Sequence, residues 1–138
     1  MRIGHIAIRI KNLEKMLNFY CNKLGLKEAF RIFNDDGSVR IVYIHISNNQ
    51  YLELCLGGER SALRDDKRSL GVRHICLVVD DLEETKKTLS QKRVLFNSDI
   101  LSLRDNNLAC YLSDPEGNNI ELMQIKPNSP HRKFEENL

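Results

Sequence analysis

Two histidines and two glutamates of this chain have the types and the spacing of a metal-binding set. His5 precedes Glu53 by 48 positions, and His74 precedes Glu121 by 47. Each histidine is the third residue of an eight-residue strand-like run, and the second run begins 69 positions after the first. An internal repeat of this kind indicates that one structural unit occurs twice. Both pairs are therefore predicted to occupy equivalent positions in that unit.

Strand geometry predicts where these side chains point. Successive side chains of a strand alternate between its faces, so Glu53 shares a face with Tyr51 and Cys55, opposite three leucines. A carboxylate among apolar neighbours is costly to bury unless a partner neutralises it. Two imidazoles and two carboxylates meet that need by binding one divalent cation, Ni, Zn, Co, Mn or Fe, with water in the remaining positions. The plainer alternatives are hydrogen-bonded structural histidines, and glutamates paired with a residue such as Arg9.

The elements that position these residues follow from the same pattern. In the first half, residues 3–10 alternate as a strand, and Asn12 and Gly25 are suited to begin and end an amphipathic helix over 13–24. Further strands are predicted after turn-forming residues, at 27–33, 39–47 and 51–56. The first half is thus predicted to have the order βαβββ.

The second half repeats that order. Asp81 is predicted to cap a helix that ends near Gln91, with Glu84 completing a capping box. The predicted strands are 72–79, 94–101, 108–113 and 119–125, the last of them after an Asp-Pro-Glu-Gly-Asn turn. The polar segment 58–70 is either a surface linker or a flap over a site. The polar tail, 127–138, is predicted to be flexible.

Composition excludes several classes of function. The chain has 138 residues, with 21 basic against 19 acidic side chains, which gives no basic surface for nucleic acid. No apolar run approaches the roughly 18 residues of a membrane span, and no signal-peptide core precedes the first strand. Four widely spaced cysteines, three of them in apolar runs, are typical of reduced, partly buried thiols. We therefore expect a cytoplasmic protein that acts on a small molecule.

Three segments of the chain are characteristic in combination: GHIAIRIKNLEKMLNFYCNKLGL, RHICLVVDDLE and LSDPEGNNIEL. Through them the chain resembles the vicinal oxygen chelate superfamily, which includes glyoxalase I, extradiol dioxygenases, methylmalonyl-CoA epimerase and fosfomycin-resistance proteins. The resemblance implies an α+β fold in which two tandem βαβββ modules, 1–57 and 71–126, form one glyoxalase-like domain over 1–126. Their mixed sheets are expected to curl into a cup around one divalent metal ion.

Within that superfamily the four-ligand site most resembles glyoxalase I (lactoylglutathione lyase). His5, Glu53, His74 and Glu121 match its metal ligands, and Arg9 matches a residue that helps to hold the thiol peptide. The resemblance implies conversion of an aldehyde–thiol hemithioacetal, such as methylglyoxal–glutathione, to the 2-hydroxyacyl thioester through a metal-bound enediolate. Glu121 is the expected base, and a homodimer is the expected assembly.

One departure keeps other activities open. Glyoxalase I usually has a threonine and an asparagine that contact glutathione after its first glutamate, whereas Glu53 is followed by Leu-Cys-Leu-Gly. The alternatives are an epimerase of a CoA thioester, a fosfomycin-resistance-type enzyme, and a binding protein without catalysis. The last two alternatives fit less well. Fosfomycin-resistance enzymes generally lack a metal ligand at the position of Glu53, and the binding proteins typically lack all of the metal ligands.

Overall fold

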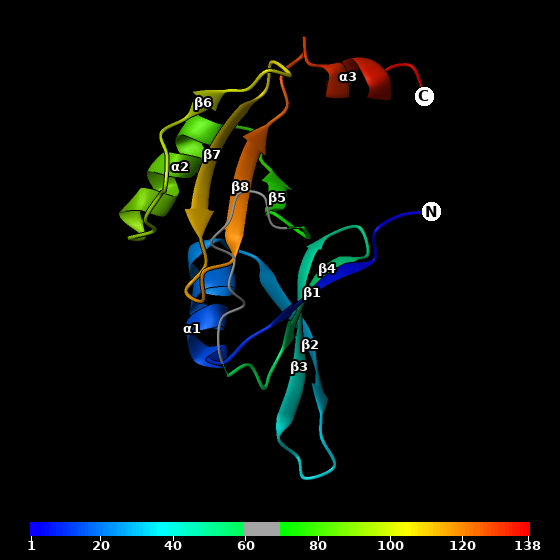
Figure 1. Ribbon diagram of the computed structural model, residues 1–138, viewed down its shortest axis with the longest axis vertical. Coiled ribbons are helices and arrows are strands. Elements are labelled where there is room, and N and C mark those ends of the chain that lie inside the picture. Colours follow the sequence, from blue (N-terminus) through cyan, green and yellow to red (C-terminus); the bar gives the residue numbers. More distant parts are fainter. Residues whose placement is uncertain (60–69) are drawn as a thin grey trace. The chain divides into compact units, whose positions relative to one another are not determined.

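The computed structural model describes residues 1–59 and 70–138. The chain divides into two compact units, Met1–Lys67 and Arg68–Leu138. Each unit contains its own four-stranded sheet, and the strands are labelled in Figure 1. Most of the segment predicted as a linker or flap, 58–70, lies outside the described residues.

The N-terminal unit is a mixed sheet with the strand order β1-β4-β3-β2. Its strands are β1 (His5–Arg9), β2 (Lys27–Phe33), β3 (Val39–Ser47) and β4 (Gln50–Cys55). β1 pairs with β4 in parallel, and the other pairs are antiparallel. The even-numbered residues Val42, Ile44, Leu52 and Leu54 are at most 1% exposed, so one face of the sheet forms the core and leaves the odd-numbered side chains on the other.

The helix between β1 and β2 begins where the sequence predicts but continues in a wider form. The Asn12 side chain accepts a hydrogen bond from the Lys15 amide at 3.0 Å and caps α1 (Leu13–Leu17). The chain then forms a π-helical segment, η1 (Asn18–Lys23). A π-helical turn holds more residues than an α-helical one, and here two successive aromatic residues, Phe19 and Tyr20, are both buried.

The C-terminal unit repeats this arrangement, with the strand order β5-β8-β7-β6. Its strands are β5 (Ile75–Val78), β6 (Leu101–Ser102), β7 (Leu108–Ser113) and β8 (Asn119–Gln124). Asp81 caps α2 (Leu82–Gln91) by accepting from the Glu84 amide at 2.9 Å. The first amide of α2, from Leu82, donates to the Gln124 side chain at 3.1 Å, which ties the helix to β8.

The strand predicted over 94–101 is largely wrong. The structure has only a single bridge, Phe96 to Leu112, and the two-residue β6. The Ser98 hydroxyl accepts the Tyr111 amide at 3.1 Å, and the Ser98 carbonyl accepts a hydrogen bond from Lys86 Nζ at 3.0 Å. A serine side chain therefore takes the place of a backbone acceptor and interrupts the ladder.

Two further boundaries differ from the sequence-based prediction. β5 begins at Ile75, so His74 lies directly before the strand and not within it. In the tail that was predicted to be flexible, Pro130–Glu135 form a short helix, α3. Ser129 caps it at 3.3 Å, and proline stands at its first turn, where no amide donor is lost.

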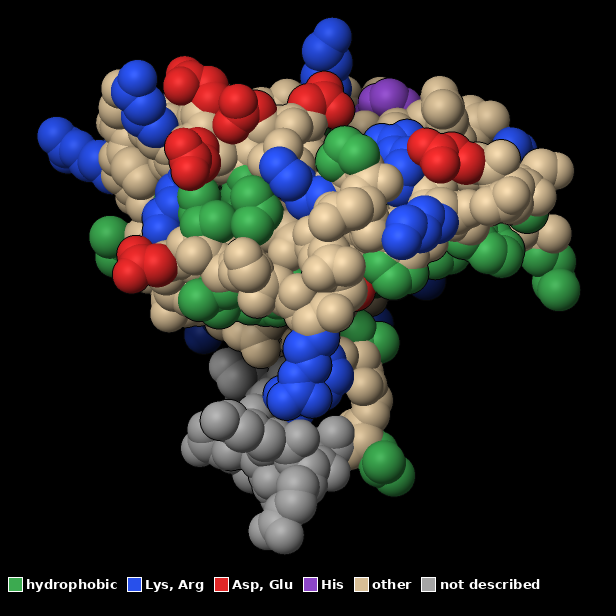
Figure 2. Space-filling model, turned by 90° about the horizontal axis from the view of Figure 1, so that it is seen from above, with side chains coloured by type: hydrophobic (Ala, Val, Ile, Leu, Met, Phe, Trp, Pro, Cys, Tyr) green, Lys and Arg blue, Asp and Glu red, His purple; other side chains and the backbone are tan. Residues whose placement is uncertain are grey.

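The predicted fold class is confirmed as an α+β fold of two glyoxalase-like modules, each with an open mixed sheet. Figure 2 shows Lys and Arg side chains interspersed with Asp and Glu on the face in view, as the near balance of 21 basic and 19 acidic residues leads one to expect. Among the described residues, no helix is long and apolar enough to cross a membrane.

Candidate metal and catalytic site

In the N-terminal unit, the sheet places Glu53 at the middle of a row of side chains. Glu53 on β4 is directly opposite Ala7 on β1 and Tyr43 on β3. It lies on the face away from the leucine core, yet it is only 8% exposed. His5 Nε2 lies 3.6 Å from Glu53 Oε1. The structure thus brings together the first predicted histidine–glutamate pair.

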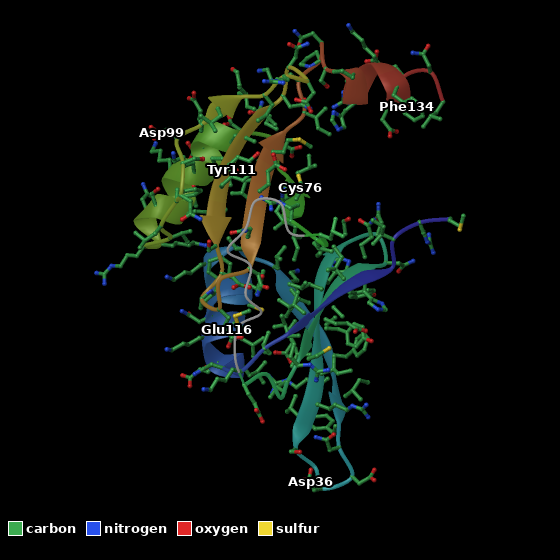
Figure 3. All side chains as sticks on the ribbon, viewed as in Figure 1. Asp36, Cys76, Asp99, Tyr111, Glu116 and Phe134 are labelled. Carbon is green, nitrogen blue, oxygen red and sulfur yellow. The ribbon has the colours of Figure 1, made fainter. Side chains whose placement is uncertain are left out.

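The C-terminal unit holds the second pair in the equivalent arrangement. Glu121 on β8 is opposite Cys76 on β5 and Tyr111 on β7, and it is 6% exposed. Cys76 and Tyr111 are labelled in Figure 3, on the strands that flank β8. His74 Nε2 lies 2.9 Å from Glu121 Oε2, so this pair is in hydrogen-bond contact.

Each pair includes a tyrosine that the sequence-based search missed. The Tyr111 hydroxyl donates to Glu121 Oε1 at 2.9 Å, and the Tyr43 hydroxyl hydrogen-bonds to Glu53. Tyr43 precedes Glu53 by ten positions, and Tyr111 precedes Glu121 by ten. That shared spacing was a detectable signal, because directly opposed residues of a repeated hairpin keep their offset.

The carboxylates shift the acidity of both tyrosines. Hydrogen bonding to Glu53 is the main cause that raises the pKa of Tyr43. Burial, followed by the hydrogen bond to Glu121, raises the pKa of Tyr111. The rings also meet the histidines edge-on, with centroid distances of 6.3 Å for His5–Tyr43 and 6.2 Å for His74–Tyr111. Each unit therefore contains one trio of histidine, glutamate and tyrosine.

Thiols lie beside both carboxylates. Cys55 Sγ lies 4.0 Å from Glu53 Oε2. Burial of the thiol, reinforced by the charge of Glu121 and a hydrogen bond to it, raises the pKa of Cys76 to about 12. All four cysteines are free thiols. Protonated at neutral pH, the two site thiols act as weak donors to the carboxylates.

Arg9 lies four residues beyond His5, on the same face of β1. Its Nη1 donates to the Leu56 carbonyl at 2.8 Å, which directs the guanidinium along the end of β4. Gly58 packs beside it: a Cβ there would come within 3.1 Å of the Ile10 backbone and 3.3 Å of Arg9 Cγ. A guanidinium has five N–H donors, so the contact with Leu56 does not exhaust its capacity to bind an anionic group.

The donor chemistry of the two pairs fits a divalent cation. Two donors at adjacent positions on one ion, each about 2.1 Å away, lie about 3 Å apart. His74 and Glu121 meet that separation at 2.9 Å, and His5 and Glu53 lie slightly wider at 3.6 Å. A carboxylate this buried also needs a compensating charge. Within 1–59 and 70–138, no three or more His, Cys, Asp or Glu side chains form a metal-binding group, so each pair contributes two donors and their union stays a prediction.

Proteins with similar sequences include a methylmalonyl-CoA epimerase and a lactoylglutathione lyase. Mitochondrial methylmalonyl-CoA epimerase of Dictyostelium discoideum is 28% identical over 96 residues, which cover 67% of this chain and 58% of that protein. The chain thus spans little more than half the length of that relative. Lactoylglutathione lyase of Neisseria meningitidis is 27% identical over 133 residues, covering 91% of this chain and 92% of the lyase.

Structural comparison supports the fold. The crystal structure of a glyoxalase family protein from Enterococcus faecalis matches with a TM-score of 0.76 at 22% identity, over 88% of this chain and 96% of that one. The family model described as "Glyoxalase/Bleomycin resistance protein/Dioxygenase superfamily" matches residues 2–122. Two modules of this fold, together with a family match over most of the sequence, establish that the chain belongs to the glyoxalase/bleomycin resistance protein/dioxygenase superfamily.

Proposed function

We propose that this protein is a metal-dependent lyase/isomerase of the glyoxalase I type. Its substrate is the hemithioacetal of a 2-oxoaldehyde and a thiol, such as methylglyoxal–glutathione, and its product is the 2-hydroxyacyl thioester. The observation that carries the proposal is the pairing of a buried glutamate with a histidine at equivalent positions of both units, at 3.6 Å and 2.9 Å.

His5, Glu53, His74 and Glu121 are proposed to hold one divalent cation, drawn from Ni, Zn, Co, Mn and Fe. Such a cation, when bound, would polarise the two neighbouring oxygens of the substrate and so acidify the carbon that carries the hydroxyl and the sulfur. Two imidazoles and two carboxylates together leave the site with no excess charge once a divalent ion is present. That balance would offset the cost of burying both glutamates.

Glu121 is proposed to move the proton. It takes the proton from the carbon that carries the hydroxyl and the sulfur, and it delivers a proton to the neighbouring carbonyl carbon. The hydroxyl proton passes to the former carbonyl oxygen, so the product is an isomer of the substrate and no other reactant is consumed. Arg9 is proposed to bind an anionic part of the thiol through the donors that do not contact Leu56.

Epimerisation of a CoA thioester is the second candidate, and the 28% identity to the Dictyostelium epimerase favours it. The same carboxylate would take the proton, and epimerisation further requires that a proton return to the opposite face of that carbon. The segment after Glu53 has no equivalent of the threonine and asparagine with which glyoxalase I contacts glutathione. Thiols other than glutathione should therefore be tested as well. The resemblance implies a homodimer, which light scattering after size exclusion would test.

The decisive experiment combines metal analysis with turnover. Protein purified without added metal is assayed for bound cations, then for activity after each candidate cation is added, with methylglyoxal and several thiols and with methylmalonyl-CoA. We expect cation-dependent turnover of one substrate class. Glu121→Gln should lower kcat by about a hundredfold or more, the usual contribution of a general base, whereas the exposed control Glu83→Gln should not. Absence of cation binding would refute the proposal, and full activity of Glu121→Gln would refute the role of Glu121.

A further inference from the structure

We propose that Tyr111, and its repeat counterpart Tyr43, are positioning residues that fix which carboxylate oxygen each site glutamate presents to a bound cation. This inference rests on the proposed function, because it assigns the tyrosines a task in the same site. It concerns the orientation of the ligands, and neither tyrosine is proposed to contact the substrate.

The contacts of Glu121 carry the argument. Its two oxygens have different partners: Oε1 accepts the Tyr111 hydroxyl at 2.9 Å, and Oε2 lies 2.9 Å from His74 Nε2. The terminal torsion of a glutamate is broad, so a carboxylate without such a partner samples many orientations. With Oε1 held by the hydroxyl, Oε2 is the oxygen available beside the imidazole donor.

Tyr111 is itself held firmly enough to do this. It lies directly opposite Glu121 in an antiparallel pair, where side chains on the same face are close neighbours. Its amide is fixed by the Ser98 hydroxyl at 3.1 Å, and its ring meets His74 edge-on at 6.2 Å. The hydroxyl therefore connects the ligand glutamate to the sheet next to it, as outer partners of metal ligands do.

The N-terminal unit repeats the arrangement with looser contacts. Tyr43 is opposite Glu53 and hydrogen-bonds to it. Glu53 Oε1, however, lies 3.6 Å from His5, and Oε2 lies 4.0 Å from the Cys55 thiol. We expect Tyr43 to contribute to ligand orientation in the same sense as Tyr111 and to a smaller extent.

The test measures cation affinity and the ligand field, neither of which requires turnover. Co²⁺ is titrated against a chromophoric chelator into the wild-type protein and into Tyr111→Phe, Tyr43→Phe and Tyr51→Phe, and the visible spectrum of each Co²⁺ form is recorded. Phenylalanine keeps the ring and removes only the hydroxyl. Tyr51 is the matched control, since it is opposite His5 and His45 in the sheet and not opposite a glutamate.

Loss of an outer partner typically weakens metal affinity by about 10- to 100-fold. We expect Tyr111→Phe to raise the Kd for Co²⁺ by about tenfold and to alter the Co²⁺ spectrum, Tyr43→Phe to do so less, and Tyr51→Phe to leave both unchanged. A Kd and a spectrum for Tyr111→Phe that match those of the wild type would overturn the inference and leave the proposed function standing. A wild-type protein that binds no cation would overturn both. Should Tyr111→Phe fail to fold, an unchanged Kd in Tyr43→Phe would overturn the inference in its place.

Discussion

The thiol of Cys76 is predicted to react slowly even though solvent reaches this residue. Its pKa is raised to about 12, first by desolvation and then by the charge of Glu121 and a hydrogen bond to it. Only the thiolate is nucleophilic, so desolvation of the sulfur and the neighbouring carboxylate together keep this thiol unreactive. Replacing Glu121 with glutamine removes that charge and should therefore lower the pKa of Cys76.

The size of the effect follows from the two pKa values. At pH 8 a thiol of pKa about 12 is ionised to about one part in ten thousand, whereas an ordinary cysteine of pKa about 8.5 is ionised to about a quarter. The thiolate population is therefore lower by about two-thousandfold. A more basic thiolate is also intrinsically more nucleophilic, by about fortyfold over this pKa interval. The net rate should be about fiftyfold lower than that of free cysteine.

The assay is disulfide exchange with an aromatic disulfide in chelator-treated protein, because a cation bound to Glu121 would cancel the charge on which the prediction depends. The reaction is followed at Cys76 by peptide mass spectrometry so that the other three cysteines do not interfere. The rate should rise with pH without levelling off up to pH 10, because the pKa lies above that range. Glu121→Gln should accelerate the reaction at pH 8, while the exposed control Glu83→Gln should not. A rate equal to that of free cysteine, or a plateau near pH 9, would refute the reasoning.

Three further predictions concern stability. The pKa values of all four cysteines and both site tyrosines are raised in the folded protein. As pH rises, the unfolded chain therefore loses these protons before the folded protein does. The free energy of unfolding should consequently fall above about pH 8.5. Urea denaturation at pH 7.5 and pH 10 measures this, and equal stability at the two values would contradict it. Gly58→Ala places a Cβ 3.1 Å from the Ile10 backbone and should lower the free energy of unfolding by about 1–3 kcal/mol. Gly4→Ala, with no atom within 4 Å of the added Cβ, should have little effect. Equal melting temperatures of the two variants would refute the crowding argument. The Asp114 carboxylate accepts three hydrogen bonds, from the Glu116 amide, the Asn118 amide and the Asn118 side chain. At about 1 kcal/mol for each bond, Asp114→Ala should lower the free energy of unfolding by about 3 kcal/mol. Urea denaturation measures this decrease, which should be well above that of the exposed control Asp36→Ala.

The sequence contained enough to predict the repeat, the order of its elements and the two histidine–glutamate pairs. Alternation of apolar residues set the faces of β1 and β4, and Asn12 and Asp81 marked the helix starts that the structure confirms through their capping bonds. The helix starts and strand faces depend on neighbours in sequence and on a period of two or 3.6 residues. The histidine–glutamate pairs, whose members are 48 and 47 positions apart, were found through the internal repeat.

The features that were missed depend on contacts between distant residues. The interruption of the predicted strand at 94–101 arises because Ser98 binds a backbone amide of β7 with its hydroxyl, which no local pattern reveals. The hydrogen bond from Tyr111 to Glu121 requires the register of the hairpin to be known. The meeting of four donors on one ion would likewise be a property of how the two units combine, which no local pattern encodes.

The confinement of each trio to one unit has a genetic consequence. A chain that lacks Glu53 still has a sound C-terminal trio, and a chain that lacks Glu121 still has a sound N-terminal trio. If an active site draws one trio from each of two chains, two inactive alleles expressed together will complement each other. If both trios come from the same chain, they will not. Two single substitutions and one co-expression therefore reveal how the duplicated halves are combined in the cell.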